Sequence, residues 1–77
     1  MTHERITIDP EIMFGKPVIK GTRITVELVL RKLAAGMTQD EIIAHHSHLT
    51  REDIRAAAGF AADRLAEEEI IFASGID

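Results

Sequence analysis

The sequence predicts a mainly α protein in which residues 1–77 form a single domain, with three helices of helix-turn-helix type after a short N-terminal β-hairpin or strand element. Three observations predict this fold. One threonine-centred spacing recurs at three expected helix starts, a glycine-containing stretch with apolar pairs precedes the first of them, and 77 residues suit one small core. The expected boundaries are an extended element over 5–24 and helices over about 26–35, 39–46 and 51–69.

The first part of the chain is expected to be extended. Residues 6–8 read Ile-Thr-Ile and precede Asp9-Pro10, which is the pattern of a half-buried strand that ends in a turn. Val18-Ile19 and Arg23-Ile24 lie on either side of Gly21. This second stretch predicts either another extended segment or a tight hairpin.

Three threonines, Thr25, Thr38 and Thr50, mark the expected helix starts. Each has an apolar residue immediately before it and another four positions after it, which is the hydrophobic staple around a threonine N-cap. Glu41, three residues after Thr38, completes a capping box, and Asp53 holds the same place after Thr50. These signals predict helices that begin at about 26, 39 and 51.

The third helix is expected to pack closely against its neighbours. Its apolar positions from Ile54 to Leu65 recur at helical spacing, and its alanines and Gly59 permit close approach. A short helix, a turn and a longer helix form the outline of a helix-turn-helix, whose second helix can enter the major groove of DNA. A compact three-helix core without any nucleic-acid role has the same outline, so both interpretations remain open.

The composition excludes several classes of protein. Without cysteine the chain has neither a disulfide framework nor a thiolate metal site. The N-terminal residues lack the basic start and apolar run of a signal peptide, and no apolar stretch approaches the ~18 residues of a membrane span. We therefore expect a soluble cytoplasmic protein with no membrane partner.

Charge is divided unevenly along the chain. Residues 1–36 hold six Lys and Arg against four Asp and Glu, whereas residues 37–77 hold three against nine. Any surface that binds anions is therefore expected in the first half, and any contact with a basic partner in the second.

Residues 15–26, GKPVIKGTRITV, combine two glycines and a proline with three cations. A turn at Gly21-Thr22 explains the glycine, but it does not require Lys16, Lys20 and Arg23. Backbone N–H groups of such a turn, together with these cations, would bind phosphate or the carboxylates of a protein partner. The alternative is a plain hairpin turn in which Arg23 pairs with a neighbouring acid.

Most of the chain, from about Ile6 to Ala66, resembles the bacterial family catalogued as "domain of unknown function 433". The stretches that carry the resemblance are ITIDPEI, GKPVIKGTRITV, LAAGMTQDEI and LTREDIRAAAGFAA. The residues that match the family's motif are Gly15, Lys16, Pro17, Gly21, Thr22 and Arg23. The chain departs from the pattern at Thr25 and Ser47, where the family often has proline.

The resemblance implies a small cytoplasmic domain of helix-turn-helix type. Members of the family are often paired with a PIN-like ribonuclease toxin and described as antitoxins. The leading functional hypothesis is therefore an antitoxin, a non-enzymatic protein that inhibits such a nuclease, with binding to its own promoter as an optional second activity. Because PIN-type active sites are acidic and depend on metal ions, a cation such as Arg23 can enter one and compete with the metal.

Two other functions fit the sequence. A DNA-binding regulator without a toxin partner would use Arg51 and Arg55, one helical turn apart on the third helix, to contact bases or phosphates. Glu52 and Asp53 lie in the same first turn, where a DNA backbone would repel them. A protein-only adaptor or dimerisation module is the remaining alternative.

No catalytic residue, cofactor or metal site is expected. The sequence has no nucleophile–base pair and no phosphate loop. His45, His46 and His48 are close in sequence, but adjacent positions on a helix point about 100° apart. They are expected near a helix C-terminus, where imidazolium is mildly favoured.

A homodimer is expected, because so small a core leaves apolar surface to cover. Ile70, Ile71 and Phe72 follow an acidic run and form one candidate surface. Pairing of the extended segments near residues 6–8 and 18–24 is the alternative seam.

Overall fold

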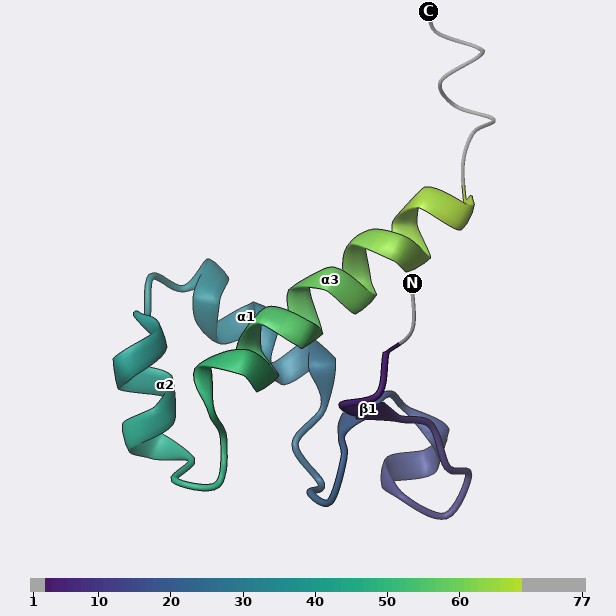
Figure 1. The fold of residues 1–77 in the computed structure, drawn as a ribbon, viewed down its shortest axis with the longest axis horizontal. Helices are drawn as coiled ribbons and strands as arrows, with labels where there is room; N and C mark the ends of the chain where they lie inside the picture. Colours follow the sequence, from purple (N-terminus) through teal and green to yellow (C-terminus); the bar gives the residue numbers. More distant parts are fainter. Residues whose placement is uncertain (1–2, 69–77) are drawn as a thin grey trace, which may run out of the picture.

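The computed structural model describes residues 3–68 of the chain and has three helices after two short strands (Figure 1). The elements in chain order are β1 (Ile6–Thr7), the short turn η1 (Met13–Gly15), β2 (Val18–Ile19), α1 (Val26–Ala34), α2 (Gln39–His45) and α3 (Arg51–Glu68). The mainly α fold class is confirmed. The helix starts are those expected, and the ends of α1 and α2 lie one residue earlier than expected.

The two strands form a small antiparallel sheet in which Ile6 pairs with Ile19 and Thr7 with Val18. Beyond β2 the chain turns back at once, and Val18 also forms an antiparallel bridge with Thr25. The sequence predicted either an extended segment or a tight hairpin for residues 18–24. Both are present, because these residues supply a strand to the sheet and a tight hairpin that leads into α1.

Threonine caps begin all three helices. The Thr25 hydroxyl accepts a hydrogen bond from Leu28 N–H at 3.0 Å, and Thr38 forms the expected capping box with Glu41. At α3 the same reciprocal pattern joins Thr50 and Asp53, since each backbone N–H donates to the other's side chain at 3.1 Å. Local sequence therefore sets where each helix starts.

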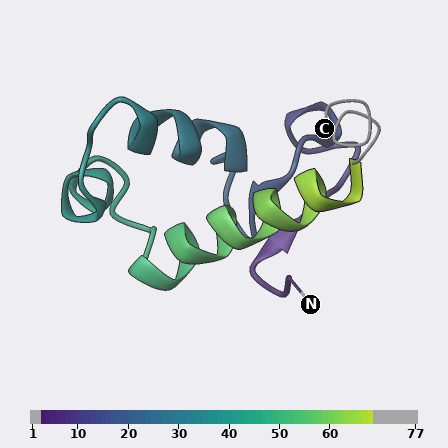
Figure 2. The ribbon, with the colours of Figure 1, turned by 90° about the horizontal axis from the view of Figure 1, so that it is seen from above.

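The helices pack around one core. α1 and α3 lie against each other, and α2 stands across their ends, as the two views of Figures 1 and 2 show. The buried apolar cluster comes from every helix, from β2 and from the loop before α3, and its members are Ile19, Val26, Val29, Ile42, Leu49, Ile54, Ala57 and Phe60. Leu65, expected on the apolar stripe of the third helix, is 68% exposed, because the core ends near Phe60.

The N-terminal segment is fastened to α3 by polar contacts. Arg5 donates to the buried carboxylate of Asp53 at 3.0 Å. His3 hydrogen-bonds Asp63 at 2.8 Å, and its ring meets Phe60 edge-on with centroids 5.2 Å apart. These contacts explain why so short a sheet holds its place beside the helices.

The turn η1 has a left-handed backbone. Met13, Phe14 and Gly15 have φ values of +49°, +59° and +83°. Only glycine adopts this conformation freely, and each other residue costs about 1–2 kcal/mol there. The Phe14 side chain is nevertheless 94% exposed, so burial of its own ring does not offset that cost.

Candidate functional site

The candidate site is the turn that joins β2 to α1, formed by Lys20, Gly21, Thr22 and Arg23 and called here the cationic turn. Thr22 N–H donates to the Ile19 carbonyl at 2.9 Å and closes the turn. Gly21 has a φ of +82°, which glycine adopts without strain. This conformation is what the sequence predicted for the glycine.

Thr22 holds the turn rigid from inside. Its hydroxyl donates to the Ile19 carbonyl at 2.8 Å and accepts from Ile24 N–H at 2.9 Å. Ile19 N–H in turn donates to the Ile24 carbonyl at 2.9 Å. Thr22 is therefore a structural residue of the turn, and the groups free to meet a partner are the side chains beside it.

Lys20 and Arg23 are exposed at the two ends of the cationic turn. Neither forms an ion pair with any residue in the range 3–68. Arg23 also borders a hollow of about 420 Å³, together with Thr7, Ile12 and Val18. The alternative of a plain hairpin turn in which Arg23 pairs with a neighbouring acid therefore finds no support within the described part of the chain.

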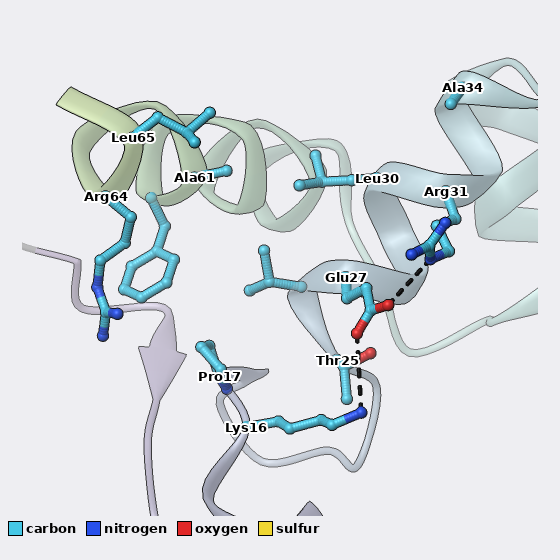
Figure 3. A pocket seen from close by; sticks show the side chains of 12 residues that line it. Lys16, Pro17, Thr25, Glu27, Leu30, Arg31, Ala34, Ala61, Arg64 and Leu65 are labelled. Carbon is cyan, nitrogen blue, oxygen red and sulfur yellow. Dashed lines mark hydrogen bonds and ion pairs between the residues drawn. The ribbon is translucent and has the colours of Figure 1, made fainter. Parts of the chain in front are cut away.

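Lys16 is engaged elsewhere. Its ammonium lies 3.7 Å from the carboxylate of Glu27 on α1, and Figure 3 shows this contact beside the one that Glu27 makes with Arg31 at 2.9 Å. The Arg31 hydrogen bond and then the Lys16 charge hold the pKa of Glu27 below its usual value. The expected group of three cations thus divides, with Lys16 facing α1.

The lowered pKa of Glu27 predicts a pH dependence of stability. The contribution of this carboxylate is fully present above its ordinary pKa of 4.5 and is lost as the pH falls through the lower folded value. We expect Glu27→Gln to be less stable than the wild type at neutral pH and equally stable well below pH 4.5. Thermal unfolding at several pH values checks this, and a difference that persists in acid would contradict it.

Arg51 and Arg55 do not join the cationic turn. Arg51, the first residue of α3, is bound to α2 through the Gln39 side-chain oxygen at 3.1 Å and the carboxylate of Asp40. Arg55 is exposed and lines a separate hollow of about 570 Å³ with Glu52 among others. No hydrogen bond or ion pair among residues 3–68 connects either arginine to the turn.

The histidines lie where the sequence placed them, at the C-terminus of α2. His45 is the last residue of the helix, His46 caps it and His48 follows in the loop. Residues 3–68 contain no group of three or more His, Cys, Asp or Glu side chains that would hold a metal ion. The candidate apolar surface at Ile70, Ile71 and Phe72 lies outside the described residues.

None of the helices in the described range combines the length and the apolar composition that crossing a membrane requires. The fold and the site together define a small three-helix domain that presents a rigid cationic turn from a two-stranded sheet. The family model "Protein of unknown function (DUF433)" matches residues 6–61, which include the whole turn. The chain belongs to this family.

Known relatives agree with this assignment. A crystal structure of a DUF433 member from Anabaena variabilis superposes with a TM-score of 0.73 at 30% identity, covering 77% of this chain and 58% of that one. An uncharacterized protein of Sinorhizobium fredii is 36% identical over 75% of this chain and 26% of its own length. An uncharacterized protein of Archaeoglobus fulgidus is 57% identical over 36% of this chain and 78% of its own length. The chain thus spans about a quarter of the first curated relative and little more than half of the solved one.

Proposed function

We propose that the protein is the antitoxin of a toxin–antitoxin pair and inhibits a PIN-like ribonuclease by direct binding. The resemblance of the GKPVIKGTRITV stretch to its family suggested this role. The observation that carries it furthest is the state of Lys20 and Arg23, which are exposed on a rigid turn without an ion pair inside the described range. Cations held in this way are positioned to form ion pairs with the carboxylates of a partner.

The rigidity of the turn matters for affinity. Thr22 fixes the backbone through hydrogen bonds at 2.8 and 2.9 Å, so binding orders few additional groups. An acidic nuclease centre offers several carboxylates and a site for a divalent cation. The Arg23 guanidinium can pair with two carboxylate oxygens at once and occupy the place of that cation.

The contacts of Arg51 favour protein binding over recognition of DNA bases. A reading helix contacts base edges with residues near its N-terminus. At the N-terminus of α3, however, Arg51 is tied to Gln39 and Asp40, and the exposed Glu52 adds negative charge. Phosphate repulsion by the Glu52 carboxylate opposes entry into a groove.

Co-expression with the product of the neighbouring gene tests the proposal. We expect a complex that survives purification and that no longer cleaves RNA, whereas the nuclease alone does. The control is the same nuclease with a Gly21→Val variant, because valine is strained at a φ of +82° and should distort the turn. If the neighbouring product neither binds nor cleaves RNA, the antitoxin proposal fails.

A mobility-shift titration with upstream promoter DNA examines the alternative function. A DNA-binding regulator would bind at low salt and lose affinity steeply as salt rises, because phosphate contacts release counterions. Arg55→Ala would then weaken binding by about 1–3 kcal/mol at one site. Absence of binding at about 50 mM salt would mean that the α2–α3 pair has a structural role and does not bind DNA.

A further inference from the structure

The exposed ring of Phe14 calls for an explanation outside its own chain. The residue has a φ of +59° and is 94% exposed, so it combines an unfavourable backbone conformation with an unfavourable surface position. Glycine would satisfy the backbone without either penalty. Large aromatic side chains displayed in this way are typical anchors of protein interfaces, where a pocket on the partner receives them.

The same molecule carries a groove of suitable character. It lies between α1 and α3 and has a volume of about 560 Å³. Its apolar lining includes Leu30, Ala34, Ala61 and Leu65, and Figure 3 shows Leu30 pointing from α1 toward α3. Leu65, a large apolar side chain, is 68% exposed at this groove.

Charges on the anchor segment and on the groove are complementary. The groove is bordered by three cations, Lys16, Arg31 and Arg64, against one carboxylate, Glu27. The segment that leads to Phe14, residues 9–14, reads DPEIMF and carries two acids and no cation. The groove thus carries an excess of two positive charges and the anchor segment carries two negative charges. This complementarity favours association of the groove of one copy with the anchor segment of another.

We propose that the groove receives Phe14 from a second copy of the chain, so that two copies form a twofold-symmetric dimer. Lys16 borders the groove and is only two residues from Phe14, so anchor and groove are neighbours on the molecule. A twofold axis between them places each Phe14 at the groove of the other copy, and both contacts form together. This dimer seam differs from both seams considered from the sequence, and it does not depend on the antitoxin role.

Sedimentation velocity of the full chain tests the dimer. We expect the wild type to dimerise at concentrations on the order of 100 µM and Phe14→Gly to weaken the dimer at least about tenfold. Leu65→Glu should have the same effect, because it places a carboxylate in the apolar groove. Leu28→Ser is the matched control, since Leu28 is 38% exposed on α1 and does not line the groove.

A mixture of the two variants tests the reciprocal contact. Phe14→Gly retains an intact groove and Leu65→Glu retains an intact anchor, so one of the two contacts can re-form in a mixed dimer. We expect heterodimers in the mixture where neither variant dimerises alone. Thermal unfolding of each variant checks that it is folded. A midpoint for Phe14→Gly that is no lower than the midpoint of the monomeric Leu65→Glu variant would show that the glycine variant keeps its fold.

Several results would overturn the proposal. These are a wild type that stays monomeric at the concentrations tested, a Phe14→Gly dimer as tight as the wild type, loss of the dimer in Leu28→Ser, and a mixture without heterodimers. The last result would mean that Phe14 and the groove do not meet. None of these results bears on nuclease inhibition, which is measured separately.

Discussion

Replacing Asp53 by alanine is expected to destabilise the protein by about 2 kcal/mol, and to lower its unfolding midpoint by about 8–16 °C. Asp53 is only 8% exposed and serves two partners. One carboxylate oxygen accepts from Thr50 N–H at the start of α3, and the other accepts from Arg5 beside β1. Alanine leaves Thr50 N–H unpaired and releases the N-terminal segment from α3.

The size of the effect is limited by Arg5, whose side chain is 51% exposed and can be solvated when its partner is lost. Asp53→Asn separates the two roles, because an amide oxygen can still accept from Thr50 N–H while the charge is gone. We expect it to lie between the wild type and Asp53→Ala. Chemical unfolding of the two variants and of Arg5→Ala provides the measurement. Equal stability of Asp53→Ala and the wild type would show that the capping contact and ion pair contribute nothing.

Replacing Arg23 by alanine is expected to weaken binding to the proposed nuclease partner by about 2 kcal/mol or more, roughly 30-fold in Kd. The reason is that buried arginines that pair with carboxylates are common centres of binding energy at interfaces. Arg23 is exposed and has no ion pair among residues 3–68, so its removal should leave the stability of the free protein unchanged. Isothermal titration calorimetry measures the affinity and thermal unfolding the stability.

Arg55→Ala is the matched control for this experiment. Arg55 is also exposed and without an ion pair in the described range, but it lies on α3 and lines a different hollow. We expect less than about a threefold change in nuclease affinity, as for a peripheral charge. A larger loss from Arg55→Ala than from Arg23→Ala would transfer the binding surface to α3 and contradict the assignment to the cationic turn.

The helices and the turn could be predicted from sequence because their signals are local. A threonine N-cap and its staple involve residues within five positions of one another, and all three predicted helix starts agree with the structure. The turn was also local, since Gly21 had to supply a positive φ. The residues from Lys20 to Arg23 form this turn, and their role in binding stays a prediction.

The features that the sequence did not predict depend on contacts between distant positions. Arg51 is bound by residues on α2, and Asp53 by Arg5 some 48 positions earlier, and no spacing rule indicates either pair. The groove arises where α1 meets α3. Phe14 gave one weak signal, its place before Gly15 in a segment that must turn, but its exposure follows only from the left-handed backbone.

The central claim, that the cationic turn occupies an acidic metal site of a nuclease, is tested most directly by metal competition. The measurement is the concentration of this protein that halves RNA cleavage, determined at increasing concentrations of the divalent cation that the nuclease uses. If Arg23 takes the place of the cation, that concentration should rise in proportion to the metal concentration, and the rise should be absent in Arg23→Ala. Inhibition that does not change with the metal concentration would contradict the claim, because the turn would then bind outside the catalytic centre.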